Sequence, residues 1–180
     1  ILKVKFLNDN KGLFCSVARS HLMDQIIYIL YNKVKHYLKT KDPISLLAVG
    51  GFGRGELAPF SDIDLLFLTR SGNKKISEKF IHFILYTLWD LGLSVGHSTR
   101  NIADVINDSK RDIILRTSVL ENRYLAGDKK LFNELNRKFK LLQKRTVSEF
   151  INLKLKEQEY RHYKMGDSRY MLEPNIKENK

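Results

Sequence analysis

Two aspartates separated by a single residue are the first feature of this sequence that could do chemistry. Asp62 and Asp64 flank Ile63 and lead into the apolar run LLFL. Side chains two residues apart in a strand point to the same side, so the two carboxylates should lie together, with Cα atoms about 6 to 7 Å apart. Mg²⁺ prefers such oxygen ligands, commonly a couple of carboxylates completed by substrate phosphates and water. We therefore expect Asp62 and Asp64 to be catalytic metal ligands beside a nucleoside triphosphate.

A glycine pair lies about eleven residues before these acids. Gly50 and Gly51 close the short apolar run ISLLAV, which is typical of a buried strand that feeds a tight turn. Because glycine has no Cβ, backbone N–H groups at such a turn can come close to a phosphate. Ser61 could give a hydroxyl to the same phosphate, and Arg54 offers a cationic fork nearby. We predict that these four residues bind the nucleotide.

Each feature alone has a simpler interpretation. A glycine pair is usually only a turn, and an Asp-x-Asp pair is usually solvent-facing charge at the end of a loop. Here, however, both acids share a strand with apolar residues, where burial of the carboxylates without a cation would cost several kcal/mol. The combination, at this spacing and in this order, favours metal and triphosphate binding.

The elements that must position these residues follow from the apolar periodicity of the chain. The stripe of Leu22, Ile26, Leu30, Val34 and Leu38 predicts an amphipathic first helix, widened by Ile27 and Tyr31. The remaining patterns predict three strands and four further helices. The expected helices are 16–40, 76–91, 111–126, 129–144 and 146–163, and the expected strands are 44–49, 63–69 and 93–99.

This element order predicts an α+β fold, with a small mixed β-sheet flanked by helices and a helical C-terminal part. We expect a catalytic domain over residues 1–105, including the first helix, and a helical part over residues 106–180. The last 15 or so residues contain Gly166 and Pro174 and lose the apolar period, so we expect them to be irregular.

Composition narrows the class of partner. The 180 residues are 43% hydrophobic, enough for one compact core, and carry a formal net charge of +12, which favours anionic partners. The single cysteine, Cys15, excludes an intrachain disulfide and a cysteine metal cage. No apolar stretch approaches the roughly 20 residues that span a bilayer. We expect a cytoplasmic protein with no membrane partner. Without an aromatic stacking platform, nucleic acid is not an expected partner either.

The glycine pair and the two aspartates together resemble the motifs of known families. Gly50-Gly51, a gap and then SDIDL resemble the signature of the polymerase β-like nucleotidyltransferase superfamily. The longer string AVGGFGRGELAPFSDIDLLFL resembles the N-terminal domain of the bacterial bifunctional PII uridylyltransferase/uridylyl-removing enzyme family. The segments LWDLGLSVGHSTRN, LENR with the later Gly127, and YMLEPNIKEN agree with that family.

The resemblance implies a polymerase β-like nucleotidyltransferase fold and a specific reaction. Gly50 and Gly51 would hold the triphosphate of UTP, and Asp62 and Asp64 would bind Mg²⁺. UMP would pass to a tyrosine of the PII nitrogen-signalling protein, with release of pyrophosphate. The family's enzymes continue into an HD-type hydrolase domain and two ACT-type regulatory domains, so we expect this chain to be a transferase fragment of a longer multifunctional enzyme.

One departure from the superfamily concerns a third carboxylate, which usually lies on the next strand. The expected strand 93–99 has none and carries His97 and Ser98 instead. Asp112 resembles a family position and is the candidate third acid, although an acid at a helix N-terminus is also favoured by the helix dipole. Arg100 and Arg123 could meet phosphate or acidic protein, or could equally make internal salt bridges.

Two other functions stay open. The chain could be a nucleotidyltransferase that acts on another acceptor, such as an RNA end, a small molecule or a different protein. It could also be a nucleotide-sensing module that binds UTP without catalysis, an alternative that the missing third acid supports.

Overall fold

The computed structural model describes residues 11–40, 42–70 and 74–164. The chain separates into two compact units, Ile1–Phe139 and Lys140–Lys180. The predicted irregular end of the chain, about residues 166–180, and the family-like segment YMLEPNIKEN both lie outside the described residues.

The first unit is built on a mixed sheet with the strand order β3-β2-β1-β4. Strand β1 pairs antiparallel with β2 and with β4, whereas β2 and β3 are parallel. This confirms the predicted fold class, a small mixed sheet flanked by helices. The strands are β1 (Ile44–Ala48), β2 (Ile63–Thr69), β3 (Val95–Arg100) and β4 (Arg123–Gly127).

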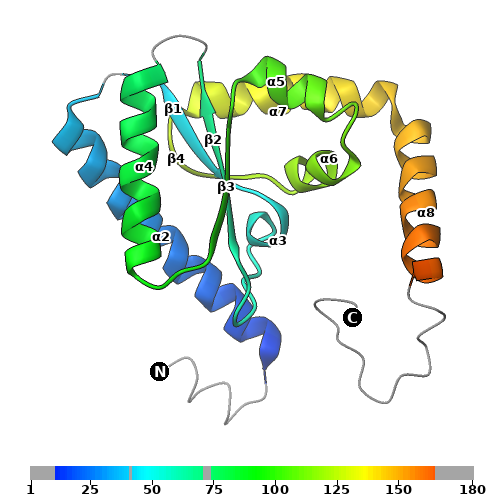
Figure 1. Cartoon of the computed structure of the whole chain (residues 1–180), viewed down its shortest axis with the longest axis horizontal. Coiled ribbons are helices and arrows are strands. Elements are labelled where there is room, and N and C mark those ends of the chain that lie inside the picture. The colour runs from blue at the N-terminus through cyan, green and yellow to red at the C-terminus, as the bar shows by residue number, and fades with distance from the viewer. Residues whose placement is uncertain (1–10, 41, 71–73, 165–180) are drawn as a thin grey trace. The chain divides into compact units, whose positions relative to one another are not determined.

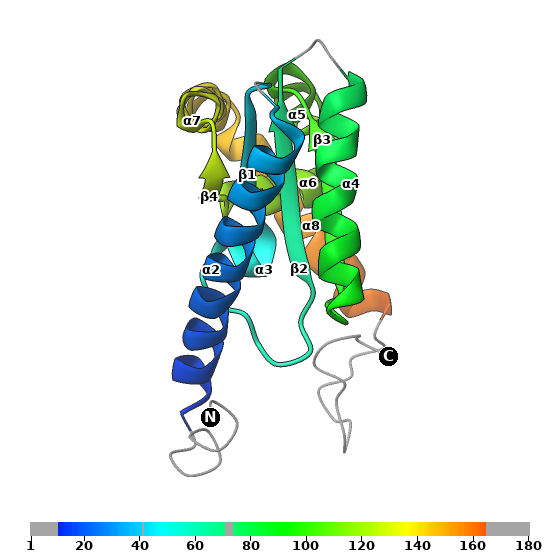
Figure 2. The ribbon, with the colours of Figure 1, turned by 90° about the vertical axis from the view of Figure 1, so that its left-hand side faces the viewer.

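Two long helices cover one face of this sheet, α2 (Gly12–Leu38) and α4 (Lys74–Asp90). Figure 1 shows both helices on the left of the strands, and Figure 2, seen from that side, shows them next to each other. Alternation along β2 directs Ile63, Leu65 and Phe67 into the hydrophobic cluster that these helices form with the sheet. Residues 62, 64 and 66 therefore belong to the opposite face, so the two aspartates are kept out of the main core.

The apolar faces of the two helices were predicted with different success. On α4 the predicted positions are all buried: Phe80, Ile81, Ile84, Leu85 and Leu88. On α2 the predicted residues Ile27, Tyr31 and Val34 are buried, and Ile26, Leu30 and Leu38 pack partly buried against the core. Leu22 was wrongly assigned to the buried face, since it is 53% exposed and Met23 is buried beside it. Tyr31 also fixes α2 to the sheet, since its hydroxyl donates a hydrogen bond to the carbonyl oxygen of Ile44 in β1 at 2.7 Å.

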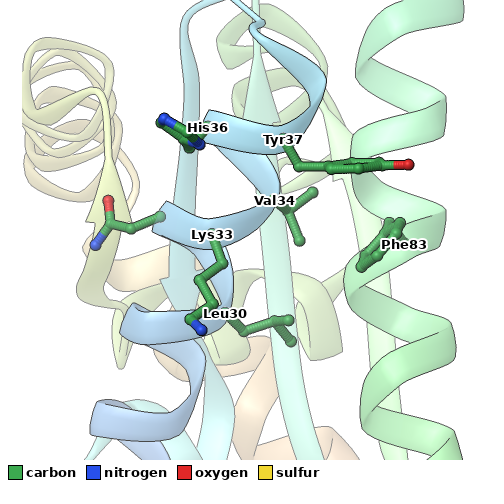
Figure 3. A pocket seen from close by; sticks show the side chains of 7 residues that line it. Leu30, Lys33, Val34, His36, Tyr37 and Phe83 are labelled. Atoms are coloured by element: carbon green, nitrogen blue, oxygen red, sulfur yellow. The ribbon is translucent and has the colours of Figure 1, made fainter.

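A largely apolar pocket of about 650 Å³ is lined by residues of these two helices (Figure 3). The Tyr37 ring of α2 and the Phe83 ring of α4 lie near each other at this pocket, with centroids 5.9 Å apart and planes tilted by 43°. None of the residues predicted to bind metal or nucleotide lines this pocket, which is formed by Leu30, Asn32, Lys33, Val34, His36, Tyr37 and Phe83.

The opposite side of the sheet carries short helices, α3 (Gly50–Gly53) and α6 (Ile113–Leu120), as Figure 1 shows. Helix α5 (Ile102–Asp108) connects β3 to α6 and was not predicted. Its start is fixed by Asn101, whose side chain accepts a hydrogen bond from the backbone N–H of Asp104 at 2.9 Å.

The predicted helix 111–126 was wrong in its second half. Helix α6 ends at Leu120, and β4 then pairs with β1, as in the pairs Leu46 with Ala126 and Leu47 with Tyr124. Pairing with a strand almost 80 residues earlier outweighs local helical preference, because it buries Leu125 and Ala126. The sheet therefore includes residues beyond 105, where we had expected the catalytic domain to end.

The last described helices match their predicted ranges closely, with α7 at Lys129–Arg145 and α8 at Val147–Lys164. In the second unit, α8 is only weakly amphipathic. Glu157 on this helix forms ion pairs with Lys154 and Arg161. No helix in the described ranges is long and apolar enough to cross a membrane.

Candidate nucleotide-binding site

Asp62 directly precedes strand β2 and Asp64 is the second residue of the strand, on the face away from α2 and α4. Asp62 is exposed and Asp64 is half-buried between neighbouring strands. Burial, together with the nearby charge of Asp62, raises the pKa of the Asp64 carboxyl above its ordinary value. The two carboxylates thus repel each other, and a cation between them would relieve that repulsion.

The structure brings the glycine turn to Asp64. The turn follows β1, where the backbone N–H of Val49 donates to the carbonyl oxygen of Asp64 at 3.1 Å. Gly50 has a left-handed backbone, with φ +58°, which favours glycine. A Cβ on Gly50 would lie 3.4 Å from Asp64 Oδ2 and 3.7 Å from Ser118 Oγ. The turn, the acid and a hydroxyl on α6 therefore come close to one another at Gly50.

A further glycine lies on the other side of Asp64. Gly96 of β3 is paired in register with Asp64, and a Cβ on Gly96 would lie 2.5 Å from Asp64 Oδ1. The missing side chain at this position leaves room for the carboxylate. Sequence reasoning overlooked Gly96, because its role depends on the pairing of β2 with β3.

Gly96→Ala should displace the Asp64 carboxylate while leaving the fold intact. The Asp64 side chain can rotate away from the added methyl, so we expect a stability change within about 1 kcal/mol. We expect nucleotidyl transfer to fall about tenfold to a hundredfold, because small misplacements of catalytic groups are costly. Thermal unfolding and product formation measure the two effects.

The control for this variant is Gly92→Ala, at a glycine where an added Cβ meets nothing within 4 Å. Its left-handed backbone, with φ +72°, makes alanine unfavourable there, so it should lose stability without losing activity in the folded protein. Equal activity of Gly96→Ala and wild type would contradict the inference that Gly96 leaves room for the Asp64 carboxylate.

Arg54, the predicted cationic fork, lies at the end of α3 between the glycine turn and α6. Its Nη1 forms an ion pair with Glu121 Oε2 at 2.6 Å. Its Nη2 lies on the side of Gly51, 3.5 Å from the position that a Cβ there would occupy. Glu121 therefore holds one half of the guanidinium and leaves the other half turned toward the glycine pair.

Helix α3 packs so closely that only glycine fits at its last residue. A Cβ on Gly53 would lie 1.8 Å from the backbone oxygen of Glu121 and 3.2 Å from that of Ala48. The prediction singled out Gly50 and Gly51 but not Gly53, whose neighbour is almost 70 residues later in the chain.

Arg123 holds α3 in place through hydrogen bonds to its backbone carbonyl groups. Its Nη2 donates to the carbonyl oxygen of Phe52 at 2.9 Å, and its Nε donates to that of Gly53 at 3.2 Å. The same guanidinium forms a two-pronged ion pair with Asp24 of α2 and donates to Ser20 Oγ at 3.2 Å. Arg123 therefore links α2, α3 and β4 through one side chain.

The open question about the two arginines is thereby answered. Arg123 makes the internal ion pair just described, and Arg100 pairs with Asp108 of α5. Both positive charges are engaged within the protein.

Arg123→Lys is expected to loosen α3, because one ammonium group cannot replace a guanidinium that reaches several acceptors in different directions. We expect a loss of about 1 to 3 kcal/mol in unfolding free energy, measured by denaturant titration, and a loss of transfer activity. The matched control is Arg100→Lys, which disturbs a half-exposed pair and should change stability by less than about 1 kcal/mol. Equal effects of the two variants would contradict the role of Arg123.

The structure places the other predicted residues as follows. Ser61 lies in the turn before β2, where its backbone N–H donates to the carbonyl oxygen of Ala58 at 3.1 Å. Asp112, the candidate third acid, caps α6: its Oδ1 accepts from the backbone N–H groups of Ile114 and Leu115 at 2.8 and 3.0 Å. The His97 ring meets the ring of Trp89 on α4, with centroids 6.0 Å apart.

The carboxylates of Asp62 and Asp64 suit a hard divalent cation whose other coordination positions are filled by substrate. Among the described residues, no three histidine, cysteine, aspartate or glutamate side chains form a group that could hold a metal ion. A carboxylate pair is nevertheless a common protein contribution to Mg²⁺, because phosphates and water fill the other positions. Asp62 and Asp64 fit this pattern.

Comparisons with known proteins agree with this geometry. The family model described as "Nucleotidyltransferase domain" matches residues 31–120, a range that contains β1 to β3, the glycine turn and both aspartates.

Curated relatives share most of the chain. It is 45% identical over 185 residues to the bifunctional uridylyltransferase/uridylyl-removing enzyme of Rhodospirillum rubrum, covering 98% of this chain and 20% of that protein. The enzymes of the same name from Azospirillum brasilense and Phenylobacterium zucineum are 44% and 43% identical, over 99% and 100% of this chain. The match lies in the N-terminal part of these enzymes, and the chain spans about a fifth of their length.

Proposed function

The chain belongs to the nucleotidyltransferase domain family, and we propose that it transfers UMP from UTP to a tyrosine of a PII-type signalling protein. The observation that carries the proposal is the placement of Asp64. Its carboxylate lies between Gly50 and Gly96 and close to the charge of Asp62, so metal and triphosphate would meet at one point. The relatives named as uridylyltransferases support a uridylyl group as the group transferred. The protein acceptor is what the family resemblance of the string AVGGFGRGELAPFSDIDLLFL implies.

The roles of the residues follow from their positions. Backbone N–H groups at Gly50 and Gly51 and the Nη2 of Arg54 would hold the β- and γ-phosphates, with Ser61 as an additional donor. Asp62 and Asp64 would hold Mg²⁺, which neutralises charge on the phosphates when bound. The tyrosine oxygen forms a new bond to the α-phosphorus, the bond to the β-phosphate oxygen breaks, and the tyrosine proton is released to solvent. Pyrophosphate leaves.

The test is incubation of the protein with a PII protein, Mg²⁺ and each triphosphate in turn, followed by intact mass measurement. We expect a mass gain equal to UMP on PII with UTP, and little gain with ATP, GTP or CTP. A gain with a different nucleotide would contradict the base assignment. Pyrophosphate release without any mass gain on PII would contradict PII as the acceptor. It would favour an RNA end, a small molecule or another protein as the acceptor.

A second candidate is a nucleotide sensor without catalysis, which is supported by one observation. The described residues contain no group of three potential metal ligands, whereas the superfamily that this sequence resembles usually has three acids. A sensor would bind Mg²⁺ and UTP without releasing pyrophosphate, even when PII is supplied.

A further inference from the structure

Helix α6 lies against the glycine turn at several points. Ser118 faces Gly50, and Glu121 meets both Gly53 and Arg54. Ser118 and Glu121 are three residues apart, so they occupy the same face at the C-terminal end of the helix. That face forms a wall beside α3, and Glu121 already has a role there because it orients Arg54. The role of Ser118 is not explained by the fold.

The Ser118 hydroxyl differs from that of its neighbour. Thr117 Oγ1 donates to the carbonyl oxygen of Ile113 one turn earlier, at 2.7 Å, as hydroxyls within helices often do. For Ser118, no hydrogen bond of this kind is recorded within the described ranges of the chain. Its Oγ instead lies 3.7 Å from the point where a Cβ on Gly50 would be, and Asp64 Oδ2 lies 3.4 Å from the same point.

We infer that Ser118 is a nucleotide-positioning residue whose hydroxyl donates a hydrogen bond to a phosphate oxygen held at the Gly50 turn. This inference rests on the proposed function, because it takes a nucleoside triphosphate as the ligand. The hydroxyl and the Asp64 carboxylate both lie within 3.7 Å of the same point, where a Cβ on Gly50 would be. A phosphate held there would therefore meet a donor from α6 on one side and the metal-binding acid on the other.

The charges around Gly50 disfavour a further acid at the position of Ser118. Asp62 and Asp64 bring negative charge, and the positive charge of Arg54 is partly neutralised by Glu121. A third carboxylate in front of Gly50 would add repulsion toward the phosphates, whereas a hydroxyl adds a donor without charge. The hydroxyl also needs no metal to make this contact, so its effect can be measured as nucleotide affinity.

The experiment compares wild type, Ser118→Ala and Ser118→Thr by calorimetric titration with a non-hydrolysable UTP analogue and Mg²⁺. A hydrogen bond to a charged phosphate is worth enough to predict about tenfold weaker binding of the analogue by Ser118→Ala. Ser118→Thr retains the hydroxyl and should restore most of the affinity. In steady-state transfer, Ser118→Ala should raise KM for UTP more than it lowers kcat.

Thr117→Val is the matched control, because it removes a hydroxyl from the neighbouring residue of the same helix. It should leave the affinity for the analogue unchanged. Ser118→Ala should keep the melting temperature of wild type, since alanine is the better helix former. A marked fall in melting temperature would identify a structural role and overturn the inference.

The outcomes separate this inference from the proposed function. If wild type binds no nucleotide, the proposed function fails. If wild type binds the analogue and Ser118→Ala binds it equally well, the proposed function stands and the role of Ser118 is overturned.

Discussion

Asp64→Asn is expected to lower nucleotidyl transfer at least about a hundredfold while the domain stays folded, because the amide keeps the shape of the carboxyl but loses the charge that would hold Mg²⁺. Asp64 is the better choice than Asp62, since it lies against both glycines and is half-buried. Activity is measured as labelled UMP transferred to PII, and folding is measured by circular dichroism. Retained transfer would contradict the assignment of the site.

Two variants control for this result. Asp90→Asn removes the same charge from the exposed end of α4 and should have no effect on transfer. Asp112→Asn is more informative, because asparagine caps a helix about as well as aspartate does. From the capping geometry we expect it to keep both stability and activity. Loss of transfer in Asp112→Asn, with the fold intact, would instead make Asp112 the third acid.

The same residue predicts how stability depends on pH in the absence of metal. The folded-state pKa of Asp64 is raised, so the folded protein holds this proton more tightly than the unfolded chain does. Its contribution to stability is then fully present below the ordinary pKa of an aspartate and is lost as the pH rises through the raised value. Asp64→Asn should lack this component of the pH profile and should be at least as stable as wild type near neutral pH. Added Mg²⁺ should stabilise wild type but not the variant.

Gly53→Ala is expected to have the largest effect on stability. The added Cβ would lie 1.8 Å from the backbone oxygen of Glu121, and a backbone atom cannot turn aside as a side chain can. Either α3 or the connection from α6 to β4 must move, at a cost of about 1 to 3 kcal/mol or more. Because α3 carries the glycine turn and Arg54, transfer activity should fall with it. Denaturant unfolding and UMP transfer measure the two losses.

Gly55→Ala separates this collision from ordinary backbone strain. Gly55 is two residues further on and has φ +81°, but an added Cβ there meets nothing within 4 Å. It should cost only about 1 kcal/mol and leave transfer nearly unchanged. A Gly53→Ala variant no less stable than Gly55→Ala would show that the close approach of α3 to Glu121 does not matter.

Local patterns were enough to predict the elements that carry the acids. Strands β1 and β2 are short apolar runs bounded by glycine, proline or polar residues, and the apolar positions of α4 repeat with helical spacing. The association of Gly50-Gly51 with Asp62 and Asp64 was predicted because the glycines end one apolar run about eleven residues before the acids begin the next. That pattern depends on neighbours in sequence, which a single sequence displays.

The parts that were not predicted depend on contacts between distant segments. Strand β4 has no strong alternation of its own and is a strand because it pairs with β1. Gly53, Gly96 and Ser118 matter only through what lies opposite them in space. Arg123 could be recognised as charged but not as a link between α2 and α3, since its partners lie about 70 and 100 residues away. The periodicity of apolar residues along a single sequence does not indicate such contacts.

The position of β2 between β1 and β3 has a consequence for how this chain can change. A slip of β2 by one residue would exchange its two faces, sending Asp64 into the apolar core and Leu65 out of it. Hydrogen bonding to β1 on one side and to β3 on the other resists such a slip, so the register of β2 is fixed. The loop between Arg54 and Ser61 carries no such constraint on its exposed residues. Insertions or deletions at its tip, near Pro59, should therefore leave the acids in place, whereas an insertion of one residue within β2 should remove the site altogether.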